Sequence, residues 1–155
     1  MKKTIFFLFL FILLVSLRPA VFSHCEVPCG IYNDEMRITM IAEHIQTIEK
    51  AMQQIIHLSE ESPQNMNQMV RWIMNKEKHA EEIQHIISQY FLTQRIKNPG
   101  SENKEDAEKY IKSLTLCHQI LVSAMKTKQT TDLNNVERLK TEVEGFKNIY
   151  FPEKK

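Results

Sequence analysis

The sequence predicts an all-α protein: an antiparallel four-helix bundle that follows an N-terminal metal-binding hook and a cleaved signal peptide. Apolar residues recur at spacings of three and four through most of the chain, which is the period of one helix face, and β-type alternation is not found. Glycine is scarce, with 3 among 155 residues. Short polar links separate four such segments, and short links favour antiparallel neighbours.

Residues 1–23 have the features of an export signal. Lys2 and Lys3 precede an apolar run over residues 5–15, which is too short to cross a bilayer. We therefore expect signal peptidase to cut after Ser23 and the mature protein to be periplasmic or extracellular. The leader holds three of the 20 basic residues and none of the 19 acidic ones, so the mature chain is slightly acidic. That balance favours neither nucleic acid nor, after processing, a membrane surface as a partner.

The residues that carry chemistry come directly after the leader, in the stretch HCEVPCGIY over residues 24–32. Cleavage gives His24 a free α-amine beside its imidazole. The amine of His24 and the amide nitrogen and sulfur of Cys25 form small chelate rings without any folding. Cys29 can return a second sulfur if the backbone turns, and the fixed φ of Pro28 suits a turn.

Two nitrogens and two sulfurs in a square suit Ni(II) or Cu(II), whereas structural zinc prefers a tetrahedron of sulfur and imidazole ligands. The imidazole of His24 is left as an axial ligand. A disulfide between Cys25 and Cys29 is the plainer alternative in an exported protein. A histidine at the cleaved terminus favours the metal, because a disulfide has no use for it.

These nine residues closely resemble the nickel-binding hook of the nickel superoxide dismutase family. The resemblance implies that His24 supplies the amine and the axial imidazole, Cys25 an amidate and a thiolate, and Cys29 the second thiolate. It places Tyr32 near the open coordination face, to gate or hydrogen-bond the substrate. It also implies a cis peptide bond before Pro28, an isomer of low cost only before proline.

The family commonly has aspartate where this chain has Glu26, a change that we expect to be tolerated. Its members also place a carboxylate and an arginine around the axial imidazole, for which Glu35, Glu43 and Arg71 are candidates. The resemblance further implies superoxide as the small-molecule substrate, one nickel per subunit cycling between Ni(II) and Ni(III), and a homohexamer of four-helix bundles.

Two other functions fit the same residues. An exported nickel or copper carrier would use the hook without turnover. A small exported bundle ligand would contain a disulfide in place of the metal. The pair Glu82 and His85 has the Glu-x-x-His spacing of di-iron bundles but lacks the second copy that such sites need. His44 and His57 have no partner at ligand spacing.

We expect residues 33–155 to form the bundle domain. The first helix covers about 33–59, with Asp34 as its N-cap. The second has Ser62 as its cap and Pro63 at its first position, and Lys76 interrupts its apolar face, so that the helix leaves the core or pairs a charge there. The segment Asn98-Pro99-Gly100 is expected to end this helix. The third helix is expected to begin at Ser101, and a link near 130–132 precedes the fourth.

Each helix has an expected core face. These faces comprise Ile38, Ile41, Ile45, Ile48, Met52 and Ile55 in the first helix; Met66, Met69, Ile73, Ala80, Ile83, Ile87 and Tyr90 in the second; Ala107, Tyr110, Leu114, Cys117 and Leu121 in the third; and Val136, Leu139, Val143, Phe146 and Tyr150 in the fourth. We expect Cys117 to behave as a small buried hydrophobe rather than a ligand.

Overall fold

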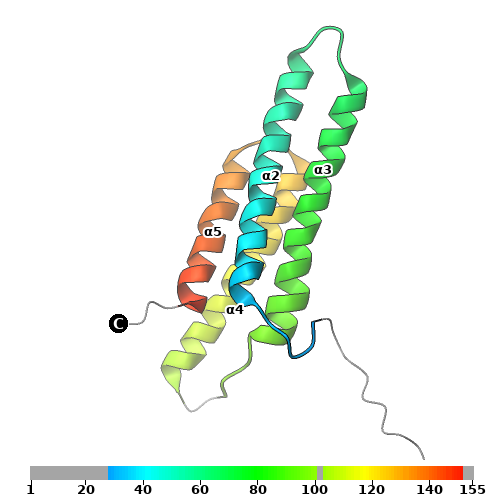
Figure 1. Ribbon diagram of the computed structural model, residues 1–155. Coiled ribbons are helices and arrows are strands. Elements are labelled where there is room, and N and C mark those ends of the chain that lie inside the picture. The colour runs from blue at the N-terminus through cyan, green and yellow to red at the C-terminus, as the bar shows by residue number, and fades with distance from the viewer. Residues whose placement is uncertain (1–27, 101–102, 152–155) are drawn as a thin grey trace, which may run out of the picture.

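The computed structural model describes residues 28–100 and 103–151, and most of them are helical (Figure 1). The elements are α2 (Asp34–Glu60), α3 (Met66–His85), the π-helix η1 (Ile86–Arg95), α4 (Lys104–Gln129) and α5 (Asn134–Tyr150). No strand occurs in these residues. The predicted all-α class is therefore confirmed, while the leader (1–23) and residues 24–27 of the hook (24–32) lie outside the described residues.

The helices form an up-and-down bundle. α2 packs mainly on α3 and α4 on α5, and the contacts of α3 with α4 and of α2 with α5 close the bundle. Figure 1 shows the α2–α3 hairpin extending past the link between α4 and α5, while the segment before α2 lies at the opposite end, beside η1. Among the described helices, none is both long and apolar enough to cross a membrane.

Asparagine caps three of the helices. The side-chain oxygens of Asn33, Asn65 and Asn103 accept hydrogen bonds from the backbone N–H groups of Met36 (3.0 Å), Gln68 (3.2 Å) and Glu105 (3.0 Å). Each bond satisfies one of the donors that a helix N-terminus leaves without an intrahelical acceptor.

Two predicted helix starts are therefore wrong. Asp34 is the first residue of α2 rather than its cap, because its carboxylate is bound by side chains from other helices. Ser62 and Pro63 lie in the turn before α3, which begins three residues after Pro63. The predicted start of the third helix at Ser101 lies outside the described residues, and α4 begins at Lys104.

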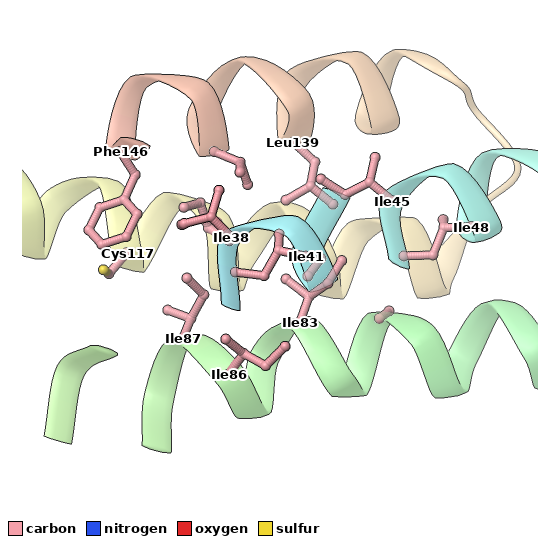
Figure 2. Close-up of a cluster of buried hydrophobic side chains, with 14 of the residues drawn as sticks. Ile38, Ile41, Ile45, Ile48, Ile83, Ile86, Ile87, Cys117, Leu139 and Phe146 are labelled. Carbon is pink, nitrogen blue, oxygen red and sulfur yellow. The ribbon is translucent and has the colours of Figure 1, made fainter. Parts of the chain in front are cut away.

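The predicted core faces of α2 and α5 are confirmed, apart from Tyr150, which is only partly buried. In Figure 2, Ile38 and Ile41 of α2 lie between Ile83 and Ile87 on one side and Phe146 of α5 on the other. The second half of the predicted second helix, which comprises the end of α3 and η1, is also buried as predicted. Its residues there are Ala80 and Ile83 in α3, and Ile87 and Tyr90 in η1.

The predicted core face fails in the upper half of α3. Met66 is 58% exposed and Ile73 39% exposed, although both share the spacing of the buried residues. Both precede Lys76, which contacts the end of α4, and so belong to the part of the α2–α3 hairpin that extends past the link between α4 and α5 (Figure 1). A periodic apolar face is buried only where another element lies against it.

The core face of α4 was also predicted incorrectly, except at Cys117. Leu114 and Leu121 are only partly buried, while Ser113 and Thr127 face the core. Their hydroxyls donate to backbone carbonyls of the same helix, at 2.8 Å and 2.7 Å, so burial leaves no polar atom unpaired. Burial raises the pKa of the Cys117 thiol to about 12, as expected for a packed, unreactive side chain.

Lys76, which interrupts the apolar face of α3, is buried and pairs with the end of another helix. Its Nζ donates to the carbonyl oxygens of Lys128 at 2.6 Å and Thr130 at 3.1 Å, where α4 ends. Carbonyls in the last turn of a helix lack intrahelical donors and carry partial negative charge. The charge expected at this position is thus compensated by a helix terminus rather than by a carboxylate.

Replacing Lys76 with methionine will destabilise the bundle, because the two carbonyls at the end of α4 then lose the charged donor that satisfies them. We expect Lys76→Met to lower the free energy of unfolding in urea by about 2–4 kcal/mol. The matched control is Lys112→Met on the exposed face of α4, which should change it by less than about 0.5 kcal/mol. Equal stability of the two variants would contradict this account of Lys76.

Candidate metal centre

The segment before α2 contains one of the predicted metal ligands. The side chain of Cys29 is exposed, and Gly30 after it has a φ of +77°, which is open to glycine without strain. The chain therefore bends directly after the thiol. The turn between Cys25 and Cys29, which the predicted hook needs, includes residues outside the described part of the chain. The other predicted ligands, His24 and Cys25, lie outside the described residues, as does the peptide bond before Pro28 that was predicted to be cis.

Tyr32 packs against η1 through its ring. The ring meets Tyr90 edge-on, with 5.9 Å between centroids, and the guanidinium of Arg95 lies 4.4 Å above its centre. The residue is 38% exposed, and its hydroxyl has no hydrogen-bond partner within residues 28–100 and 103–151. The ring is thus held while the hydroxyl stays available.

Asp34 brings three elements together at the same end of the bundle. Arg95 of η1 donates to both carboxylate oxygens, from Nε at 2.8 Å and from Nη2 at 2.7 Å. The hydroxyls of Tyr90 in η1 and Tyr150 in α5 donate to it as well, at 2.5 Å and 2.7 Å. Because a π-helix joins residues five apart, it places Tyr90 and Arg95 on the same face.

These contacts fix the charge states of the cluster. Partial burial opposes ionisation of Asp34, but hydrogen bonds from Arg95, Tyr90 and Tyr150 outweigh it and lower the pKa of the carboxyl. Burial, together with the hydrogen bond to Asp34, raises the pKa of each of the two tyrosines to about 12. At neutral pH the cluster is an ion pair with two neutral phenols.

Arg37 is a second cation at this end of the bundle. Its guanidinium lies 4.9 Å from the centre of the Tyr90 ring. Its Nε is shielded from solvent without an acceptor, and no carboxylate pairs with it in the described part of the chain. A donor that lacks an acceptor, at the same end of the bundle as the segment with the exposed Cys29 thiol, fits the predicted nickel ligands, which are two thiolates and an amidate and carry negative charge.

The three candidates proposed from sequence for the surroundings of the imidazole are all exposed: Glu35, Glu43 and Arg71. Arg71 belongs to the first half of α3, which lies at the opposite end of the bundle from the segment before α2 (Figure 1). The arginines near the arm are instead Arg37 and Arg95. Sequence reasoning missed Arg95 because 61 residues separate it from Asp34, and helical spacing gives no signal over that distance.

A histidine pair between α2 and α3 was also missed. His44 and His79 share a hydrogen bond between their Nδ1 atoms at 2.8 Å, and the Nε2 of His44 is buried without a partner. Burial, and then the proximity of His79, lower the pKa of His44, while Glu82 and Glu43 oppose and Lys78 reinforces the shift. No group of three or more metal-binding side chains occurs among the described residues.

The pair predicts an acid-sensitive stability. Since the pKa of His44 is lower in the folded protein than the ordinary histidine value of about 6.5 that holds in the unfolded chain, the unfolded chain binds more protons around and below that pH. The contribution of neutral His44 is complete above that pH and is lost as pH falls through the folded pKa. We expect a slope of at most about 1.4 kcal/mol per pH unit, measured by urea unfolding between pH 7 and 5.

His44→Gln should flatten this profile, whereas His57→Gln, which removes an exposed histidine of the same helix, should preserve it. Identical slopes in the wild type and both variants would show that another group titrates.

Comparison with known proteins gives one family. The model of the nickel-containing superoxide dismutases matches residues 19–155, which include the hook and the whole bundle. Searches of curated proteins and of solved structures found no match. Because the family match covers most of the sequence, the chain belongs to the nickel-containing superoxide dismutases, oxidoreductases with a nickel cofactor.

Proposed function

We propose that the mature chain converts superoxide to hydrogen peroxide and dioxygen at one mononuclear nickel site per subunit. Two superoxide anions and two protons give one molecule of each product. The proposal rests on the match of the family model to residues 19–155. When bound, nickel supplies one-electron redox chemistry by alternating between Ni(II) and Ni(III).

The proposed ligands are His24, Cys25 and Cys29. His24 donates its α-amine and its imidazole, Cys25 its amide nitrogen and thiolate, and Cys29 the second thiolate. Anionic sulfur and amidate donors release electron density to the metal, which stabilises its higher oxidation state. The exposure of Cys29 and the turn at Gly30 support this assignment.

Tyr32 is proposed to gate or hydrogen-bond superoxide. Its ring packs on Tyr90 under Arg95, and its hydroxyl is without a partner in the described residues. The positive charge of Arg37, which no described carboxylate offsets, favours the approach of a small anion. Tyr90 and Tyr150, whose pKa values are raised to about 12, stay protonated at neutral pH and donate hydrogen bonds to the Asp34 carboxylate.

The direct test is superoxide decay followed with purified protein that begins at His24. The nickel-loaded protein should accelerate the decay catalytically, and the metal-free protein should not. Tight nickel or copper binding without acceleration would indicate the carrier. A mass lower by two hydrogens, without bound metal, would indicate the disulfide-linked bundle ligand.

The proposed maturation is removal of residues 1–23 by signal peptidase during export to the periplasm or the extracellular space. It would leave the hook (24–32) at the start of the bundle domain (33–155). Support comes from the apolar leader and from the ligand role of the α-amine, which requires a free N-terminus. N-terminal sequencing of secreted protein should read His-Cys-Glu.

We also propose assembly into a homohexamer, because an arm of nine residues has little core of its own to hold it. Large apolar side chains exposed on α3, such as Met66, Val70 and Met74, support self-association. Sedimentation of the nickel-loaded protein should give six subunits. Full activity in a protein that sediments as a monomer at working concentration would contradict the proposal.

A further inference from the structure

We propose that Asp34 and Arg95 act as positioning residues for the metal-binding arm. In this inference the pair holds Tyr32, and through Tyr32 the segment that carries Cys29, in one place on the bundle. It rests on the proposed function for the roles of Tyr32 and Cys29. Neither residue of the pair is assigned to the metal or to the substrate.

Arg95 contacts the arm and the bundle at once. The central carbon of its guanidinium lies over the Tyr32 ring, 4.4 Å from the ring centre, while its Nε and Nη2 donate to Asp34 at 2.8 Å and 2.7 Å. Two parallel charge-assisted hydrogen bonds fix the plane of a guanidinium as well as its position. A plane fixed in this way gives the Tyr32 ring a rigid surface to stack on.

Asp34 is itself held from two further directions. Tyr90 and Tyr150 donate to its oxygens, and Tyr90 also packs edge-on against Tyr32. The carboxylate therefore joins the start of α2 to η1 and to the end of α5. Side chains from η1 meet the Tyr32 ring on its face and at its side, so movement of the ring would disturb both contacts.

Tyr32 is the packed side chain in this part of the arm. Ile31 is 82% exposed, and Cys29 and Gly30 are exposed as well. Pro28, before the thiolate ligand, is partly buried. The aromatic contact between the arm and the bundle is that of Tyr32, three residues after Cys29. Ligands held in the productive geometry retain a metal longer than ligands on a loose chain.

The test compares Arg95→Gln and Arg95→Lys with Lys97→Gln in the mature protein. Lys97 is exposed, lies two residues from Arg95 and has no ion pair among the described residues, so its variant removes the same charge without touching Tyr32. ¹⁵N relaxation of the metal-free protein should show the Tyr32 order parameter falling from about 0.85 to below about 0.6 in Arg95→Gln. Nickel release to a chelator should become about tenfold faster.

Arg95→Lys keeps the charge but loses the planar fork, so it should fall between the wild type and Arg95→Gln. It also keeps the proposal testable if Arg95→Gln does not fold. Unchanged order parameters and release rates in Arg95→Lys would overturn the inference, and so would equal changes in Lys97→Gln. Order parameters of metal-free protein do not depend on superoxide chemistry, so a failure of the proposed activity would be seen separately.

Discussion

A protein that begins at His24 will bind nickel and consume superoxide, and the same protein with one alanine before His24 will do neither. The α-amine is proposed as a ligand, and in the extended protein that nitrogen becomes part of a peptide bond, which is a poor donor. The added residue also occupies space beside the metal. We expect nickel content and superoxide turnover to fall to the level of metal-free protein.

Both proteins should fold alike, because the buried residues of the bundle lie in the helices from Asp34 onwards. Circular dichroism and thermal unfolding check this. His24→Ala is the matched control: it keeps the terminal amine and loses the imidazole, so it should retain much of its nickel and turn over more slowly. Equal nickel content and equal rates with and without the added alanine would rule out ligation by the amine.

The sequence predicted the number of helices and their links because each helix has its own apolar period. It did not predict over what length of each helix the apolar face is buried. Met66 and Ile83 share one period, yet Met66 is exposed and Ile83 is fully buried, since Met66 precedes and Ile83 follows Lys76, which contacts the end of α4. Periodicity describes a face of one helix, whereas burial depends on the lengths of its neighbours.

Local competition between polar groups explains the errors at the helix starts. Asp34 and Asn33 can both cap a helix. Asn33 does so, and Asp34 is free to bind Arg95 because the π-helix brings that side chain to it. A π-helix has no simple sequence signature. The ligands, by contrast, were predicted from one contiguous motif, whereas the residues around them come from three separate elements.

Loss of either hook thiol will abolish nickel binding and superoxide turnover. A serine hydroxyl does not deprotonate near neutral pH, whereas a thiol with a pKa near 8.5 does so readily beside a metal. We therefore expect Cys25→Ser and Cys29→Ser to lower nickel affinity by at least about a hundredfold. The thiolate-to-nickel absorption should disappear together with the activity, as titration with nickel under a chelator would show.

Cys117→Ala is the matched control, since it removes the remaining cysteine of the chain. Its thiol is buried in the bundle, and burial raises its pKa to about 12, so it supplies no thiolate. This variant should keep its nickel spectrum and its rate, at some cost in stability from the cavity. If nickel binding depended on Cys117 and survived Cys29→Ser, the metal site would have to lie in the core and the proposed ligands would be wrong. The described residues contain no group of three or more metal-binding side chains there.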